Sequence, residues 1–414
     1  MTPALLASFL FGLYLSELSP GISRTSVSIK MAAAHDSRNN DANNDVDIVN
    51  AFNSVPSAKW DGVANSLRTN SGVATIDFLP PDICSMHAAC FETARRGLDV
   101  AKRNRGDDTT SAVIRKIGPN DDSAHATGYH CAGSDGSSMS RYNSYREGFV
   151  FSDGNIFDVD LGENDNERRQ GQIIFQSDME TFFASMHDAI AVNVLRAIAR
   201  NLGCQDENWF QTKLGPTDES SQWHVKRYVC PTATDGENEC SECNDNRDIE
   251  EEIEWLPVHT DPSLISIVLH DVPGKREGAM GLQYQVPDPS SSSENDSNPK
   301  SKKKIWVDVP WHGHAVATVF VGSVLSYITG NLYPGAKHRV VYRPSKSIEE
   351  SERVAATLFV RPRGDCKLLV PPSPLFLTAE GDSSVRIRNT TFDAWLARVS
   401  RNYMKGRNKN GESK

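Results

Sequence analysis

The sequence has no excess of positive charge. Its 414 residues include 44 Lys and Arg against 54 Asp and Glu, which gives a formal net charge of −10. A protein that binds nucleic acid normally carries a basic stripe or patch on its surface. The charge balance therefore argues against a nucleic-acid partner.

The sequence also lacks an apolar run long enough to cross a bilayer, which needs about 20 residues. The run from Ala4 to Leu15 is shorter and has no basic flank before it, so we expect no integral membrane span. Residues 19–30 contain Ser, Arg and Lys without acids, as transit peptides do. Two interpretations stay open: residues 1–30 form an organelle (plastid-like) address, or Met31 is the true start of a cytoplasmic protein.

No regular cysteine framework is present. The eight Cys are scattered, which is typical of free thiols in a reducing compartment. Cys240 and Cys243, with Cys230 upstream, have metal-like spacing, but no fourth ligand is apparent. We interpret this acidic stretch as a solvated loop.

The composition is sufficient for a sizeable core, with 38% hydrophobic residues. We divide the chain into four regions. These are a targeting segment and disordered joint at 1–50, a helical and mixed region at 51–220, a β-rich core at 221–365, and a C-terminal helix with a basic tail at 366–414.

The N-terminal half has clear start and stop signals. A strand is predicted at Gly72–Phe78, followed by a helix that Pro81 opens and that runs to about Arg103. The capping box Ser177-Asp-Met-Glu180 predicts the start of a long apolar helix that Gly203 ends. His187 lies in this helix, and we assign it a structural or solvent-facing role.

From Trp223 onward the apolar pattern changes to a period of 2, which is typical of strands. The fold class predicted is mainly β with flanking helices, around a double-stranded β-helix (jelly-roll) core. A further helix is predicted at Thr391–Met404. The strands predicted in the core are 223–229, 255–259, 265–270, 281–286, 305–309, 315–320, 324–329, 337–342 and 353–360.

Three residues in this core have the pattern of a metal site. His259 and Asp261, at i and i+2, project from the same side of an extended strand. His338 arrives from a distant strand. Two imidazoles and one carboxylate with open positions opposite suit non-haem Fe(II) and its oxygen chemistry. A zinc site, or a relic without activity, has a similar ligand set.

Several motifs carry a resemblance to a known family. They are His259-Thr-Asp261 with its apolar tail, Trp306-Val-Asp-Val-Pro, Ile328-Thr-Gly-Asn-Leu-Tyr, His338-Arg-Val-Val and Arg353-Val-Ala-Ala-Thr-Leu-Phe. In order and character, residues 221–365 resemble the catalytic core of the isopenicillin-N-synthase-like Fe(II)/2-oxoglutarate-dependent dioxygenases. A weaker match extends back to about residue 70.

The resemblance implies an oxidoreductase that hydroxylates, desaturates or cyclises a small organic substrate and releases succinate and CO2. It implies Fe(II) held by His259, Asp261 and His338, with 2-oxoglutarate and O2 as cosubstrates and ascorbate as a supporting reductant. We expect a monomer. Two alternatives remain: an iron-dependent oxidase that does not use 2-oxoglutarate, and a non-catalytic barrel that binds a small acid.

The resemblance also implies residue roles at the cosubstrate, with two departures. Arg353 matches the anchor of the distal carboxylate of 2-oxoglutarate, because a guanidinium fork pairs with a carboxylate. The family's Arg-x-Ser is Arg353-Val-Ala355 here, and its Asn-x-Tyr is Lys226-Arg-Tyr228. Tyr228 retains its hydroxyl, whereas Lys226 either replaces the lost Ser as a carboxylate partner or extends to solvent.

Two residues of the last strand are candidates for the substrate side. Phe359 matches a position that the family packs against substrate, and plain core packing is the alternative. Arg361 shares its strand face. It either favours an acidic substrate or is a charge at the solvated rim.

Overall fold

The computed structural model describes residues 52 and 54–103, 128–130, 146–152, 156, 159, 165–229, 253–271, 278–291, 303–311, 316–342, 352–376 and 390–411. All of these lie in one compact unit, Ile48–Lys414. The predicted targeting segment and the Cys240 and Cys243 motif with its neighbour Cys230 lie outside the described residues. The predicted region boundaries at 220 and 365 stay predictions.

Two antiparallel sheets form the centre of this unit. The larger sheet has seven strands in the order β1-β9-β6-β11-β4-β3-β2, and the smaller has four in the order β5-β10-β7-β8. Strands of the larger sheet are β1 (Val73–Ile76), β2 (Gly128–His130), β3 (Arg146–Ser152), β4 (Gln222–Val229), β6 (Ile265–Asp271), β9 (Ala317–Val321) and β11 (Glu352–Val360). Strands of the smaller sheet are β5 (Ile253–His259), β7 (Gly278–Pro287), β8 (Lys304–Trp311) and β10 (His338–Tyr342).

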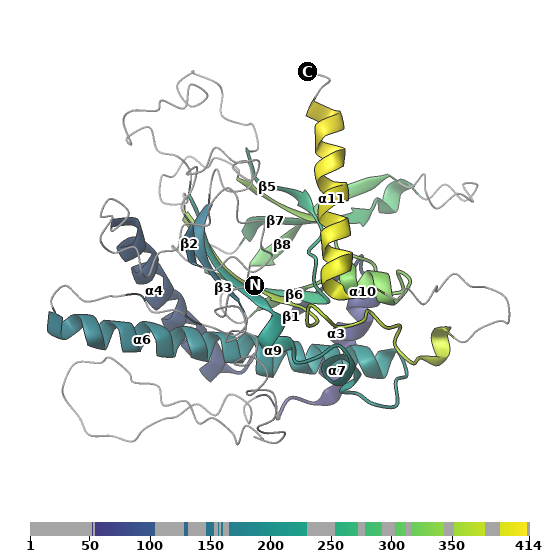
Figure 1. Ribbon diagram of the computed structural model, residues 1–414, viewed down its shortest axis with the longest axis horizontal. Coiled ribbons are helices and arrows are strands. Elements are labelled where there is room, and N and C mark those ends of the chain that lie inside the picture. Colours follow the sequence, from purple (N-terminus) through teal and green to yellow (C-terminus); the bar gives the residue numbers. More distant parts are fainter. Residues whose placement is uncertain are drawn as a thin grey trace, which may run out of the picture. The chain divides into compact units, whose positions relative to one another are not determined.

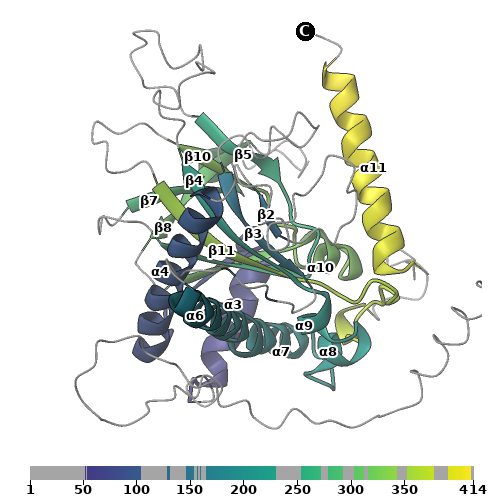
Figure 2. The ribbon, with the colours of Figure 1, turned by 60° about the vertical axis from the view of Figure 1, so that its left-hand side comes forward.

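Helices lie along the outer face of the larger sheet (Figures 1 and 2). They are α3 (Ser57–Thr69), α4 (Pro81–Arg103), α6 (Asp165–Ala184), the π-helical segment η3 (Ser185–Ala191) and α7 (Val192–Asn201), followed by the short helices α8 (Trp209–Lys213) and α9 (Thr217–Ser220). Apolar side chains pack these helices against the larger sheet. Phe182, Met186 and Ile190 are fully buried, and the ring of Phe182 contacts the ring of Trp223 of β4 edge-on.

Side-chain alternation on β4 decides which residues face which layer. Trp223 and Arg227 point toward the helices, where Arg227 pairs with Glu147 and Asp99. Lys226 and Tyr228 therefore point the other way, into the space between the two sheets, as the period of 2 predicts.

The long helix differs from its prediction in two ways. It begins at Asp165 rather than at Ser177, so the capping box lies inside α6 and caps nothing. It also changes to a π-helical segment at Ser185 before α7 continues to Asn201. The predicted end is confirmed, because Gly203 adopts a φ of +74° just past the helix.

One core prediction was wrong. Residues 324–329 form helix α10 (Ser323–Ile328) and not a strand. A six-residue apolar run is too short for periodicity to distinguish the two structures. The other predicted strands of the core are present within a few residues of their expected ends.

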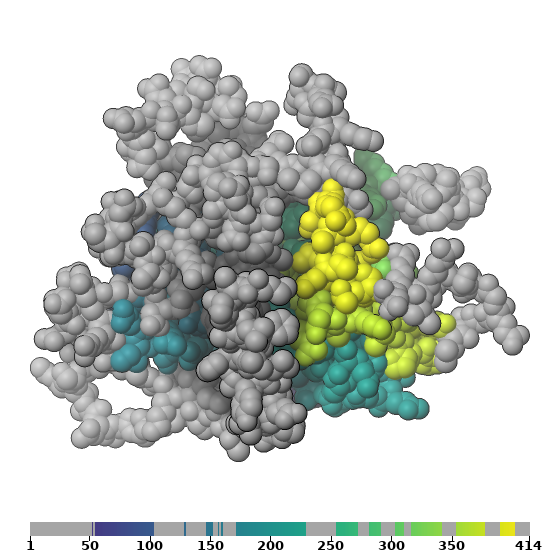
Figure 3. Space-filling view, viewed as in Figure 1, coloured from purple at the N-terminus to yellow at the C-terminus, as the bar shows by residue number. Residues whose placement is uncertain are grey.

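The C-terminal helix α11 (Phe392–Gly411) is longer than predicted. It is held at its beginning, where the ring of Trp395 lies 5.9 Å from the ring of Tyr327. In the space-filling view it stands out on the surface (yellow in Figure 3).

Among the described residues, one segment, Gly171–Asn201, is long and apolar enough to span a membrane by composition alone. Of its apolar stretch, 67% is buried in the protein. We therefore attribute its apolarity to packing against the larger sheet.

Candidate metal centre and cosubstrate cavity

A cavity lies between the inner faces of the two sheets. Its polar lining residues are Arg146, His224, Lys226, Tyr228, His259, Asp261, His338, Arg353 and Thr357, and its apolar lining residues are Leu256, Val268, Leu282, Val340, Ala355 and Phe359. We call His259, Asp261 and His338 the metal end of this cavity. We call Arg353, Tyr228 and Lys226 the cosubstrate end.

The fold brings the three metal-end residues together through strand pairing. His259 ends β5, His338 begins β10, and these two residues are direct cross-strand partners. Asp261 follows two residues after His259, and its backbone carbonyl accepts hydrogen bonds from the backbone N–H and the hydroxyl of Ser323 at the start of α10. The helix that was predicted as a strand thus fixes the backbone of the carboxylate.

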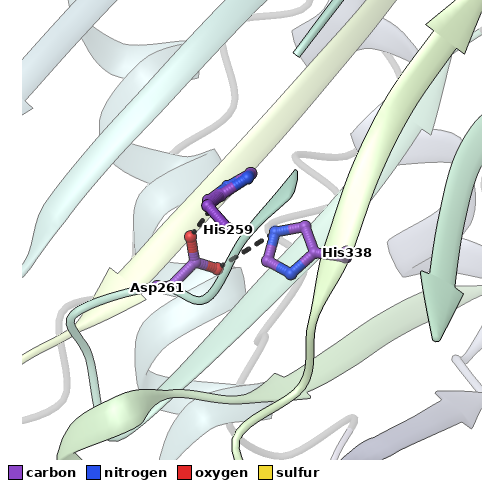
Figure 4. Close-up of side chains that lie close together, drawn as sticks. All are labelled: His259, Asp261 and His338. Atoms are coloured by element: carbon purple, nitrogen blue, oxygen red, sulfur yellow. Dashed lines mark ion pairs between the residues drawn. The ribbon is translucent and has the colours of Figure 1, made fainter. Parts of the chain in front are cut away.

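The ligand atoms converge as Figure 4 shows. Nε2 of His259 lies 3.4 Å from Oδ1 of Asp261, and Nε2 of His338 lies 3.6 Å from Oδ2 of the same carboxylate. One nitrogen or oxygen atom from each of the three residues lies within 4.8 Å of the others. Among the described residues no other group of three such side chains has this spacing.

Both imidazoles are set in the same tautomer. Nδ1 of His259 lies 2.7 Å from the carbonyl oxygen of Pro257, and Nδ1 of His338 lies 3.2 Å from that of Ala336. Because a carbonyl oxygen only accepts, each Nδ1 carries the proton and donates it. Each Nε2 thus has a lone pair that faces Asp261, which is the arrangement that metal-binding histidines show.

Burial and mutual proximity set the charges of this end. Burial lowers the pKa of His338 to about 4, and the nearby His259 acts in the same direction. Burial alone would raise the pKa of Asp261, but the neighbouring His338 and His259 outweigh it, so this pKa lies below its usual range. At neutral pH this end therefore offers a neutral His338 ring and an ionised Asp261 carboxylate.

Arg353 lies on β11 at the other end of the cavity. It is 4% exposed, and its guanidinium carbon lies 4.9 Å from the ring centre of Tyr228, its register partner on β4. Its Nη2 donates to Nδ1 of His270 at 3.0 Å. Its Nε and Nη1 are buried and have no hydrogen-bond partner in the described part of the chain. Burial lowers the pKa of Arg353 to about 10, so it remains charged.

Lys226 does not extend to solvent, because it is only 4% exposed. It lies opposite Ala355 on one side and Gly148 on the other. A Cβ at position 148 would lie 2.6 Å from Cδ of Lys226, so the glycine makes room for the lysine stem. Burial, together with the charge of Arg146, lowers the pKa of Lys226 well below its usual value.

Of the two candidates for substrate contact, Phe359 and Arg361, only Phe359 lines the cavity. Phe359 lines the cavity and meets the ring of His224 edge-on, with ring centres 4.7 Å apart. Arg361 is not a cavity-lining residue, and its guanidinium carbon lies 5.8 Å from the Phe359 ring centre. At 8% exposure it is not a solvated rim charge either.

Four residues in or beside the cosubstrate end of the cavity were not among the predicted site residues. His224 was within reach, because it precedes Lys226 by two residues on the same strand face. His270, at i+2 from cavity-lining Val268, carried the same signal. Thr357 carried it as well, two residues before Phe359 on the same strand face, whereas Arg146 gave no local signal, because only the pairing of β3 with β4 brings it to the cavity. His187 is structural as expected, since it is buried and bonds to Thr217 and Asp188.

Comparison with known proteins finds a match to one family model. Residues 236–362 match the model of the 2OG-Fe(II) oxygenase superfamily. The comparison with curated proteins gives no match.

Three solved structures resemble this one. A full-length Neurospora crassa protein in complex with alpha-KG is 17% identical, with a TM-score of 0.56 over 84% of this chain and 93% of that chain. A putative 2OG-Fe(II) oxygenase family protein from Caulobacter crescentus is 16% identical, with a TM-score of 0.53 over 84% and 94% of the two chains. The rice dioxygenase for auxin oxidation is 16% identical, with a TM-score of 0.51 over 84% and 91%. At these identities the likeness shows a shared fold.

Proposed function

We propose that this chain, which belongs to the 2OG-Fe(II) oxygenase superfamily, oxidises a small organic substrate in the cavity between its two sheets. It is an enzyme of the Fe(II)- and 2-oxoglutarate-dependent kind. The observation that carries the proposal is that one cavity holds both a two-imidazole, one-carboxylate cluster and a buried guanidinium with unsatisfied donors. The two facing antiparallel sheets also support the predicted jelly-roll core.

The metal end fits Fe(II). Two neutral nitrogens and one carboxylate from one side of a site, with the remaining positions left to small ligands, suit this ion in oxygenases. The carbonyls of Pro257 and Ala336 fix both rings, and outer contacts of this kind typically contribute about 10–100-fold in metal affinity. We assign iron binding to His259, Asp261 and His338.

Bound Fe(II), with 2-oxoglutarate and O2, supplies the oxidising chemistry that inserts oxygen or removes hydrogen from a substrate C–H bond. The chain's share is to hold the reactants in place and to exclude water. Leu256, Val268 and Val340 form apolar walls beside the metal end and serve this second task.

The cosubstrate end fits a carboxylate. A buried guanidinium with two free nitrogen atoms leaves donors without partners, which costs free energy unless a ligand accepts from them. A carboxylate matches the fork geometry of Arg. We assign Arg353 to the distal carboxylate of 2-oxoglutarate, and we place Tyr228 beside it as a hydroxyl donor.

Lys226 is our candidate for the function of the missing serine. It is the direct register partner of Ala355, and its buried side chain lines the cavity near Arg353. An ammonium group there would donate to the same carboxylate that a serine hydroxyl would reach. The closeness of a carboxylate would also raise the depressed pKa of this amine.

We propose that the substrate lies against Phe359 and His224, whose rings form one aromatic corner of the cavity. The Neurospora crassa structures were determined with thymine and with 5-formyluracil, and the rice relative is a dioxygenase for auxin oxidation. These are small organic molecules, which supports a small substrate here. Arg361 can act on such a substrate only through Phe359 or after a local rearrangement, because it does not line the cavity.

The test is the release of labelled CO2 from 1-labelled 2-oxoglutarate by the full-length protein with Fe(II), O2 and ascorbate. We expect slow release without substrate, loss of release in Asp261→Ala, and release in Arg353→Leu only at much higher 2-oxoglutarate concentrations. Iron binding without any 2-oxoglutarate turnover or binding would favour the oxidase that uses no 2-oxoglutarate. Absence of iron binding would favour a small-acid-binding barrel.

A further inference from the structure

A buried histidine outside the metal centre contacts the proposed cosubstrate anchor. His270 lies on β6 next to β11, in direct register with Ala355, and it is 4% exposed. Its Nδ1 lies 3.0 Å from Nη2 of Arg353. It is not one of the three residues of the metal end.

The contact with Arg353 fixes the protonation state of the His270 ring. A guanidinium has only donors, so Nδ1 of His270 must be the acceptor and must carry a lone pair. The ring is therefore neutral, and its proton is on Nε2. Burial and the charge of Arg353 lower the pKa of His270 well below its usual value, which keeps the ring neutral at physiological pH.

The guanidinium is thus held from two strands at once. Tyr228 on β4 covers its face, with the ring centre 4.9 Å from the guanidinium carbon, and His270 on β6 accepts from Nη2. Nε and Nη1 stay without partners in the described residues. His270 therefore takes one of the two N–H groups of Nη2, and the other one, together with Nη1 or Nε, remains for a carboxylate.

We propose that His270 is a positioning residue that sets the guanidinium of Arg353 for the distal carboxylate of 2-oxoglutarate; this rests on the proposed function. An unrestrained Arg side chain loses rotamer freedom when a ligand orders it. Where the side chain is already ordered in the free protein, that cost is removed from binding. His270 therefore strengthens cosubstrate binding without touching the cosubstrate.

The test compares two keto acids of the same chain length. 2-Oxoglutarate has the distal carboxylate, whereas 2-oxopentanoate ends in a methyl group. Dissociation constants are measured by calorimetry on the full-length protein with Fe(II) under anaerobic conditions, so that no turnover is needed. The variants are His270→Leu, which removes the acceptor, and His270→Asn, whose amide oxygen replaces Nδ1.

We expect His270→Leu to bind 2-oxoglutarate about tenfold more weakly and 2-oxopentanoate with unchanged affinity. His270→Asn should recover most of the loss. In the Arg353→Leu background, His270→Leu should have no further effect, because the two residues act through one contact. Equal weakening of both keto acids, no weakening of either, or failure of the Asn variant to recover would overturn the positioning role.

A measurement on the wild-type protein keeps the inference testable if His270→Leu does not fold. Nitrogen NMR of protein labelled at histidine should show His270 as the neutral Nε2–H tautomer before cosubstrate is added. A protonated ring or the Nδ1–H tautomer would overturn the proposal. The proposed function fails separately, if wild-type protein binds 2-oxoglutarate no more tightly than 2-oxopentanoate.

Discussion

At the metal end of the cavity a carboxylate lies between two imidazoles, whereas the cosubstrate end has a guanidinium, an amine and a phenol hydroxyl and no carboxylate. The first group needs only a cation to complete it, since its lone pairs converge on one point. In the second group two buried nitrogen atoms of Arg353 have no hydrogen-bond partner among the described residues, and an anion would satisfy them. One cavity therefore has two unlike requirements, which a metal ion and a dicarboxylate meet together.

The two ends also differ in how the chain builds them. His259 and Asp261 are two residues apart, and one cross-strand pair adds His338. The cosubstrate end draws Arg353, Tyr228 and Lys226 from β11 and β4, with His270 from β6. A site built from several paired strands has more positions at which a residue on one strand can replace the function of a residue lost on its neighbour. Lys226, opposite Ala355, is our candidate for such a replacement.

The largest effect is expected at the metal end. His338→Ala or Asp261→Ala should lower Fe(II) affinity by more than about 100-fold, because loss of an outer contact alone costs up to that much. The measurement is bound iron per chain after equilibration with stoichiometric Fe(II) without oxygen. Asp365→Asn is the matched control, because it removes an exposed carboxylate that does not line the cavity. Full iron occupancy in His338→Ala would refute the assignment.

Arg353→Leu should be next in size. It should weaken 2-oxoglutarate binding by about 2–5 kcal/mol, at least about 30-fold in Kd, and leave iron binding unchanged. Arg353→Lys should lie between, since an ammonium group cannot match the fork. If Kd for 2-oxoglutarate is the same in Arg353→Leu as in wild type, another residue is the anchor.

The same contrast explains which parts of the site could be predicted from the sequence. The metal end was predictable because i, i+2 spacing on a strand and a third ligand before an apolar strand are local signals. Helix α10 was not, since Ser323–Ile328 is a short apolar run whose helical state depends on a tertiary contact with the Asp261 carbonyl. The start of α6 was also missed, because a capping box reports a local preference that a continuous buried helix overrides.

The cosubstrate end was predictable only in part, for the same physical reason. Alternation on β4 placed Lys226 and Tyr228 on one face, but it could not decide between cavity and solvent for the lysine. That choice depends on Gly148, a residue 78 positions earlier whose missing side chain makes room for Lys226. The contact between His270 and Arg353 likewise follows from register, which a single sequence does not reveal.

Lys226→Met should separate stability from function. A lysine whose pKa is depressed in the folded protein destabilises it at neutral pH, because the unfolded chain binds the proton more readily. Met of similar length should raise the free energy of unfolding by about 1–3 kcal/mol at pH 7, while weakening 2-oxoglutarate binding. Chemical denaturation gives the first quantity and calorimetry the second.

The pH dependence of the stability gain in Lys226→Met tests whether the depressed pKa of the lysine is its cause. Above the unfolded pKa of about 10.4 the lysine is neutral in both states, so the stability gain of Lys226→Met should vanish as pH approaches 11. Lys102→Met, on the exposed part of α4, should show no gain at pH 7. A gain in Lys226→Met that persists unchanged at high pH would mean that packing, and not a buried charge, is its source.

The smallest effect is expected at Ala355, and it depends on the background. If Lys226 already serves the carboxylate, Ala355→Ser should change 2-oxoglutarate affinity little in the wild-type protein. In Lys226→Met the same substitution should recover about 1 kcal/mol, the net value of one hydrogen bond, since positions 226 and 355 are register partners. The four dissociation constants form a double-mutant cycle, whose coupling term measures the exchange directly. Equal gains from serine in both backgrounds would show that the hydroxyl and the amine act independently, and that Lys226 has not replaced the serine.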